Sequence, residues 1–175
     1  MRKKTVALVL VVCLVVTGLF AASGNVQFKA SVSPRLTGMG FTFTSIENHS
    51  TSKFSAGVGG DFVAIFKNGM GPYVAFSGQF TDSTYGLTVA FAYQTKLNNN
   101  IDLLATVGPQ LTFANKNTTL GISAMCNFDF KLTQSMFARL GVGANIDFVT
   151  FRSGNSSTYF SLYTPIPSFA LGWRF

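Results

Sequence analysis

The sequence is poor in the side chains from which metal centres and disulfide frameworks are built. It contains one histidine, His49, and two cysteines, Cys13 and Cys126, among 175 residues. One histidine with so few cysteines falls far short of a metal-ligand set. Cys13 lies in an N-terminal segment that we expect to be removed, which leaves Cys126 without a partner for an internal disulfide. We therefore expect no metal, no cofactor and no disulfide in the folded protein.

Charged residues are also scarce. They make up 11% of the chain, whereas 47% of residues are hydrophobic and 14% are aromatic. The formal net charge of +7 includes Arg2, Lys3 and Lys4, so the rest of the chain carries about +4, without a basic run. This modest, scattered charge argues against nucleic acid as a partner. So few charges would also make a poor water-facing surface.

The third absence is a long apolar run in the body of the chain. After residue 22, no unbroken apolar stretch approaches the ~20 residues that a membrane-spanning helix needs. Hydrophobic residues recur instead at every second position, which is the period of a β-strand. A chain without spanning helices can cross hydrocarbon only as a closed β-barrel, because every backbone polar group must be paired there.

The N-terminal segment has a different organisation. A basic start at residues 1–4 is followed by an uncharged apolar run from Val6 to Val16 and by small residues at positions 21–24. This order is typical of a secretory signal peptide. We predict a signal peptide at residues 1–23 and one domain at residues 24–175, since about 150 residues suit a single domain. The alternative is an uncleaved membrane anchor, because residues 5–22 nearly reach spanning length.

The remaining chain divides into eight alternating segments separated by polar residues. The expected strands start near Val26 and cover Phe54–Phe66, Val74–Phe80, Tyr85–Gln94, Ile101–Phe113, Leu120–Lys131, Met136–Phe148 and Phe169–Phe175. Pro34 is expected to break the phase of the first strand, and Pro109 to make the fifth irregular.

The lengths of the connections indicate an orientation. Short turns are expected near Asn68, Asn99 and Gln134, and the longest loops near His49 and at residues 152–158. In bacterial outer-membrane barrels the short turns lie on the periplasmic side. We therefore predict an all-β fold, a transmembrane antiparallel up-and-down barrel of eight strands, with both ends in the periplasm.

The two faces of these strands differ in chemistry. One face is crowded with phenylalanine, and the other carries small residues and nearly all the charges that fall within strands. The charged set is Lys29, Asp61, Asp102, Asp129, Lys131, Arg139, Asp147 and Arg174. These groups can neutralise one another inside a narrow lumen but would be costly in lipid. We predict a lumen ion network in which Arg139 and Arg174 are the central cations, because guanidinium groups bridge carboxylates bidentately.

A soluble barrel of lipocalin type is the competing architecture. Its apolar face would point inward around a ligand, and its charged face would meet water. The phenylalanine side chains have more volume than an eight-stranded interior can hold, which disfavours this arrangement.

The C-terminal residues alternate strictly. Phe169, Leu171, Trp173 and Phe175 fall on one face of the last expected strand. This ending, the signal-peptide pattern and the eight alternating segments resemble the small outer-membrane β-barrel proteins of Gram-negative-type bacteria, the OmpA/OmpX/OmpW-like group. The resemblance implies an integral protein of outer-membrane lipid, escorted by periplasmic chaperones. It also implies that the barrel assembly machinery reads those four residues as a C-terminal assembly signal.

Such a resemblance does not fix one activity. His49 lies between Glu47 and Ser50 in one loop, and residues so close in sequence cannot hold a base between a nucleophile and an acid at ~3 Å each. We expect a structural or surface-interaction barrel, not an enzyme, with a lumen plugged by charged and polar side chains. No motif in the external loops identifies a ligand. The alternatives are a narrow porin-like channel for small or apolar solutes and, third, a lipid-modifying barrel enzyme.

Overall fold

A computed structural model of the protein describes residues 26–37, 55–80, 83–114, 117–152, 155–163 and 168–175. The expected signal peptide at residues 1–23 and the first external connection with His49 lie outside the described residues.

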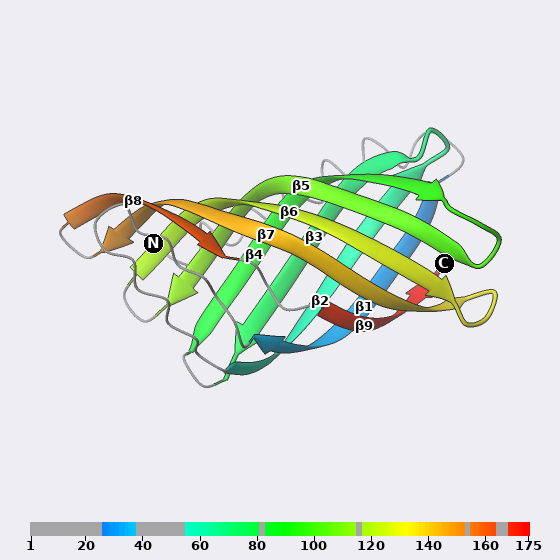
Figure 1. Cartoon of the computed structure of the whole chain (residues 1–175), viewed down its shortest axis with the longest axis horizontal. Coiled ribbons are helices and arrows are strands. Elements are labelled where there is room, and N and C mark those ends of the chain that lie inside the picture. The colour runs from blue at the N-terminus through cyan, green and yellow to red at the C-terminus, as the bar shows by residue number, and fades with distance from the viewer. Residues whose placement is uncertain (1–25, 38–54, 81–82, 115–116, 153–154, 164–167) are drawn as a thin grey trace.

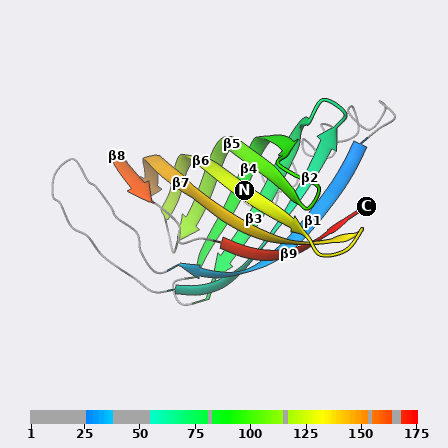
Figure 2. The same cartoon turned by 45° about the vertical axis from the view of Figure 1, so that its right-hand side comes forward.

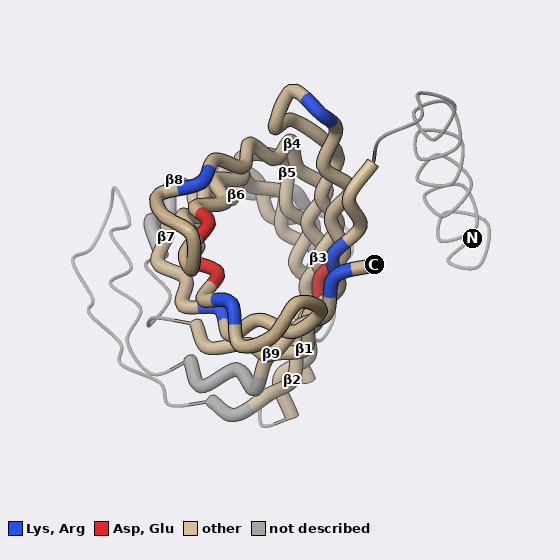
Figure 3. The backbone as a smooth tube through the Cα atoms, turned by 90° about the vertical axis from the view of Figure 1, so that its right-hand side faces the viewer, with Lys and Arg blue, Asp and Glu red and all other residues tan. Residues whose placement is uncertain are grey.

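The described chain forms one antiparallel sheet that closes on itself (Figures 1 and 2). Its strands are β1 Val26–Thr37, β2 Ser55–Phe66, β3 Met70–Gln79, β4 Thr84–Lys96, β5 Ile101–Ala114, β6 Asn117–Lys131, β7 Met136–Arg152, β8 Asn155–Tyr163 and β9 Ser168–Arg174. Each strand from β1 to β7 pairs with the next one, and β9 pairs with both β7 and β1. The view along the barrel shows the resulting ring (Figure 3).

The last position in the ring is shared by two strand segments. β8 pairs with one half of β7, from Asn145 to Arg152, and β9 pairs with the other half, from Met136 to Gly141. The nine segments therefore occupy eight strand positions. The predicted architecture, an up-and-down barrel of eight antiparallel strands, is confirmed.

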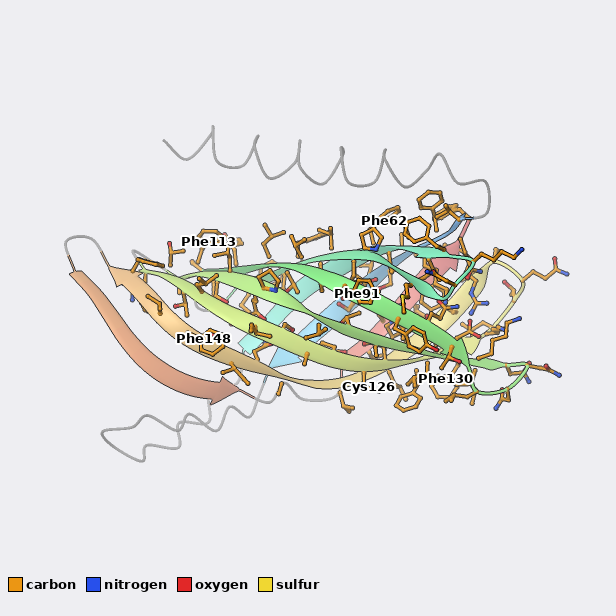
Figure 4. All side chains as sticks on the ribbon, turned by 90° about the horizontal axis from the view of Figure 1, so that it is seen from above. Phe62, Phe91, Phe113, Cys126, Phe130 and Phe148 are labelled. Atoms are coloured by element: carbon orange, nitrogen blue, oxygen red, sulfur yellow. The ribbon has the colours of Figure 1, made fainter. Side chains whose placement is uncertain are left out.

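The side chains are distributed inside out relative to a water-soluble protein. Large apolar residues on the outer face are exposed, among them Phe76 at 60% and Phe91 at 51%, whereas Lys29, Asp102 and Asp129 are buried inside. Figure 4 shows the labelled phenylalanines projecting from the outer surface. The lipocalin-type alternative is wrong, because it requires the opposite orientation of both faces. Among the described residues there is no helix long and apolar enough to span a membrane.

The polar segment at residues 152–158, expected to be a long loop, is largely strand. β7 continues to Arg152, β8 begins at Asn155, and these two residues are register partners. That prediction is wrong. Backbone pairing needs no apolar face, so a polar hairpin extension carries none of the alternation from which the other strands were predicted.

Pro34 does not break the first strand. β1 pairs with β2 in one continuous register from Val26 to Thr37, through Pro34 itself. The backbone oxygen of Phe28 accepts a hydrogen bond from Phe175, so even-numbered residues of β1 direct their backbone groups towards the last strand. The donor that proline lacks is therefore missing on that side of β1 and not on the side of β2.

The irregular ladder expected at Pro109 is confirmed. Between β4 and β5 the pairs Thr88↔Gln110 and Phe91↔Val107 are formed, but the two pairs between them are not. A Cβ atom on the neighbouring Gly108 would lie 2.4 Å from the Cα of Ala90 and 2.4 Å from the backbone oxygen of Val89. The two strands are pressed together here, and only glycine leaves the space.

This close approach predicts different outcomes for two glycines of the sheet. Gly108→Ala should destabilise the barrel by about 1–3 kcal/mol, because the atoms it meets are backbone and cannot turn aside. Gly78→Ala is the control, since its Cβ would meet only the Tyr85 ring at an ordinary 3.5 Å. Urea unfolding in detergent micelles measures both. Equal stability of the two variants would show that the contact at Gly108 imposes no constraint.

Candidate functional site

The charged side chains of the lumen gather near one end of the barrel because of the antiparallel connectivity. The turns after β2, β4 and β6, the start of β1 and the end of β9 all lie at this end (Figure 1). Seven of the eight predicted lumen charges are joined there by ion pairs. We refer to them as the lumen cluster: Lys29, Asp61, Asp102, Asp129, Lys131, Arg139 and Arg174.

Arg139 binds two carboxylates from different strands. Its Nε and Nη2 donate to the two oxygens of Asp129 at 2.6 and 3.0 Å, and its Nη1 donates to Asp61 at 2.7 Å. Asp129 is the register partner of Arg139 on β6, so the bidentate pair is held by adjacent backbones. Both side chains are buried, and such charge-assisted, two-point contacts are the strongest hydrogen bonds available to proteins.

The fully buried ammonium group of Lys29 lies between two carboxylates. Its Nζ is 3.1 Å from Asp129 and 3.4 Å from Asp102. Asp61, in turn, accepts a hydrogen bond of 2.5 Å from the hydroxyl of Ser31. The carboxylates of β5 and β6 therefore join β1 to the opposite side of the ring, and the carboxylate of β2 joins Ser31 to Arg139 on β7.

Asp102 is shared by more cations than any other carboxylate of the lumen cluster. Besides Lys29, it faces Nη2 of Arg174 at 3.2 Å and Nζ of Lys131 at 3.5 Å. The Lys131 ammonium also donates to the backbone oxygen of Asn99 in the neighbouring turn. Arg174 was expected to be a central bidentate cation, but among the described residues it makes only this one ion pair.

Phe137 is a central residue of the site that the charge pattern did not identify. Its ring is fully buried, and Lys29, Arg139 and Arg174 stand 5.5, 5.0 and 5.6 Å from its centroid. A cation over an aromatic face gains electrostatic stabilisation, more so when water is excluded. Its register partner Gly172 leaves space for the ring, since a Cβ there would lie 2.2 Å from a ring carbon. Phe137 lies two residues before Arg139 in β7, and this spacing places both side chains on the inner face of the strand.

The wall beside the lumen cluster is apolar, which was also not predicted. Side chains of β2 to β5 that share the inner face with Asp61 and Asp102 form a buried hydrophobic group. Its members are Val63, Ile65, Tyr73, Ala75, Ala90, Ala92 and Leu104. The lumen at this end is thus filled partly by ion pairs and partly by apolar packing.

Asp147 lies apart from the other predicted charges. It is on β7, eight residues beyond Arg139, and no ion pair among the described residues includes it. In the same part of β6 and β7, the hydroxyls of Thr119 and Thr150 share a hydrogen bond of 2.8 Å. Among the side chains that the structure describes, the two halves of the lumen therefore differ: one contains the lumen cluster and the other the Asp147 carboxylate.

The four aromatic and aliphatic residues of the expected C-terminal signal lie on the outer face of β9 or just beyond it. Phe169, Leu171 and Trp173 are between 41% and 45% exposed, and Phe175 is 77% exposed. The backbone of Phe175 donates to Phe28, so the chain remains paired to its last residue. Within the described part of the chain, no group of three His, Cys, Asp or Glu residues could hold a metal ion.

No protein-family model and no curated protein sequence matches this chain. Solved structures do match it. Ail, the attachment invasion locus protein of Yersinia pestis, superposes with a TM-score of 0.57 at 10% identity over 87% of this chain and 100% of Ail. Neisserial surface protein A gives 0.54, and OprG from Pseudomonas aeruginosa gives 0.51, each at 10% identity over 86% of this chain and 96% of the other.

The fold is that of a small outer-membrane β-barrel. At 10% identity the likeness establishes the fold alone, and it agrees with the resemblance drawn from the sequence.

The contacts of Arg139 predict a large effect of removing it. Arg139→Met would leave Asp129 and Asp61 buried with fewer cations, and breaking a buried pair in this way costs about 3–5 kcal/mol. Lys131→Met is the matched control, because Lys131 is 22% exposed and makes its ion pair at 3.5 Å. Its loss should cost at most about 1 kcal/mol. The free energy of unfolding in urea, followed by the mobility shift of heated and unheated samples, distinguishes the two variants.

Proposed function

We propose that this protein is an integral outer-membrane β-barrel with a structural or surface-interaction role, closed inside by the lumen cluster. The observation that carries the proposal is the segregation of charge: apolar side chains cover the outside, and the charged side chains meet in the lumen. A membrane-spanning barrel needs this arrangement, because only its outer face contacts hydrocarbon.

The outer membrane as location is supported by the fold and by the two ends of the sequence. Export would use the signal peptide proposed at residues 1–23, followed by the barrel domain at residues 24–175. Periplasmic chaperones and the barrel assembly machinery are the proposed partners during insertion, with Phe169, Leu171, Trp173 and Phe175 as the assembly signal. The exposed apolar positions of the other strands would then contact outer-membrane lipid.

A closed lumen is supported by the ion pairs of the lumen cluster. Every cation of the lumen cluster has a carboxylate oxygen within 3.5 Å. The pairs join β1, β2, β5, β6, β7 and β9, so they cross the interior from several directions. An eight-stranded barrel has an interior just wide enough for side chains to fill. The carboxylates of the lumen cluster are engaged by cations, which leaves them poorly suited to acid or base catalysis.

A role at the cell surface is supported by the hairpin of β7 and β8, which lies at the end of the barrel away from the short turns (Figure 1). Ail, which is similar in fold, is named for attachment and has been solved with the heparin analogue sucrose octasulfate.

A narrow channel is the second candidate, and one observation favours it. The lumen cluster contains four cations against three carboxylates, and Nε and Nη2 of Arg174 are buried without a hydrogen-bond partner among the described residues, although Nη2 lies within ion-pair distance of Asp102. An excess of positive charge in a lumen would select small anions.

The location is tested by expressing the full chain in a Gram-negative host. We expect the protein in the outer-membrane fraction, with an N-terminal sequence that begins near Gly24 and with the faster gel mobility of an unheated folded barrel. Recovery in the inner membrane with Met1 retained would overturn the location and favour the uncleaved anchor.

The closed lumen is tested by single-channel conductance in planar bilayers with the protein extracted from that membrane. The native protein should show no stable openings, and Arg139→Ala should introduce them by removing the cation that joins Asp61 to Asp129. Lys131→Ala, at the exposed edge of the lumen cluster, is the control and should remain silent. Stable openings of the folded native protein would contradict the plug and favour the channel.

A further inference from the structure

The ring closes through its shortest ladder. β1 and β9 share four residue pairs, from Lys29↔Arg174 to Val32↔Leu171, whereas β5 and β6 share fourteen. Beyond Val32, β1 pairs only with β2, and β8 pairs only with β7, within the described part of the chain. We call these four pairs the seam. A ladder of this length supplies few backbone hydrogen bonds, so side chains must contribute to holding it together.

The first pair of the seam is unfavourable by itself. Lys29 and Arg174 are direct register partners, and both carry a positive charge into the lumen. Like charges directly opposite one another destabilise antiparallel pairing. Burial strengthens the repulsion, because Lys29 is fully buried and the Arg174 side chain is only 10% exposed. The ring of Phe137 near both groups softens this repulsion but brings no negative charge.

The compensating charge comes from across the lumen. Asp102 lies at the start of β5, four strand positions from β1, and belongs to neither seam strand. One of its oxygens, Oδ2, is 3.4 Å from Nζ of Lys29 and 3.2 Å from Nη2 of Arg174. Lys29 has Asp129 as a second carboxylate, but Arg174 has no other among the described residues. A single carboxylate oxygen therefore bridges the two cations that would otherwise push β1 and β9 apart.

We propose that Asp102 is a latch that holds the β1–β9 seam shut from the opposite wall. When its charge is removed, Lys29 and Arg174 face each other with one bridging anion fewer, and the seam opens while the other eight ladders persist. The inference requires the closed barrel but neither a plugged lumen nor a particular surface role, so a failure of the conductance test would leave it standing.

The chain provides its own probe of the seam. Trp173 is the single tryptophan of the sequence and pairs with Ala30 in the seam, on the outer face. In Asp102→Asn, reconstituted in phospholipid vesicles, the seam-facing backbone amides of Ala30, Val32, Leu171 and Trp173 should exchange with deuterium about tenfold faster than in the native protein. Trp173 should also become more accessible to acrylamide in the water phase. Amides of the long β5–β6 ladder should keep their native exchange rates.

The matched control is Asp147→Asn, the same substitution at a lumen carboxylate that has no ion pair among the described residues. It should leave seam exchange and Trp173 quenching unchanged. If Asp102→Asn matches this control at the seam, or if it accelerates exchange equally in all ladders, the latch is refuted.

A cross-strand disulfide separates opening of the seam from failure to fold. Val32→Cys with Leu171→Cys joins two register partners of the seam on the outer face, and directly opposite residues of an antiparallel pair lie about 5.5 Å or less apart, close enough for a disulfide. In a background of Cys13→Ala and Cys126→Ser, the bridge allows Asp102→Asn to fold with the seam locked. Native-like exchange while oxidised, followed by rapid seam exchange after reduction in the vesicles, is the expected result. Slow seam exchange after reduction would overturn the proposal.

Discussion

The structure depends on one constraint: a charge removed from water must find a partner of opposite sign. The bidentate pair of Arg139 with Asp129 is its clearest expression, since both groups are almost entirely buried. The remaining features of the interior are arranged around that pair. Lys29 neutralises the same carboxylate from β1, and Phe137 fills the space between the cations with Gly172 making room for its ring.

Much of the fold could be predicted because lipid-facing and lumen-facing residues alternate along every strand of a membrane barrel, so that hydrophobic residues recur at every second position. The alternation predicted eight strand positions, the short turns and the assignment of the charges to the inner face. The turn at Gly69 followed from the residue type, and its φ of 82° is one that favours glycine. The charges could be grouped as a set, because nearly all the charges within the expected strands fall on one face of those strands.

What could not be predicted depends on neighbours across the ring. Alternation along the strands places Asp102 and Asp147 on the same face. Only the pairing of the strands shows that Asp102 reaches three cations, whereas Asp147 reaches none among the described residues. Pro34 was misjudged because the sequence does not say on which side of a strand a missing donor falls. Val63 and Leu104 were overlooked because an apolar residue on a polar face carries no signal until its packing is known.

The sequence separation of the contacts has a consequence for how the protein reaches its native state. Lys29 meets Asp102 and Asp129 across 73 and 100 residues. Contacts between residues so far apart in the sequence form late and slowly, because the long segment between them must be ordered before the contact stabilises the fold. β1 is therefore synthesised before the residues that stabilise its buried charge. The first strand emerges with a charge whose partners are made much later, so the nascent chain gains little from folding early and much from remaining unfolded until its end arrives.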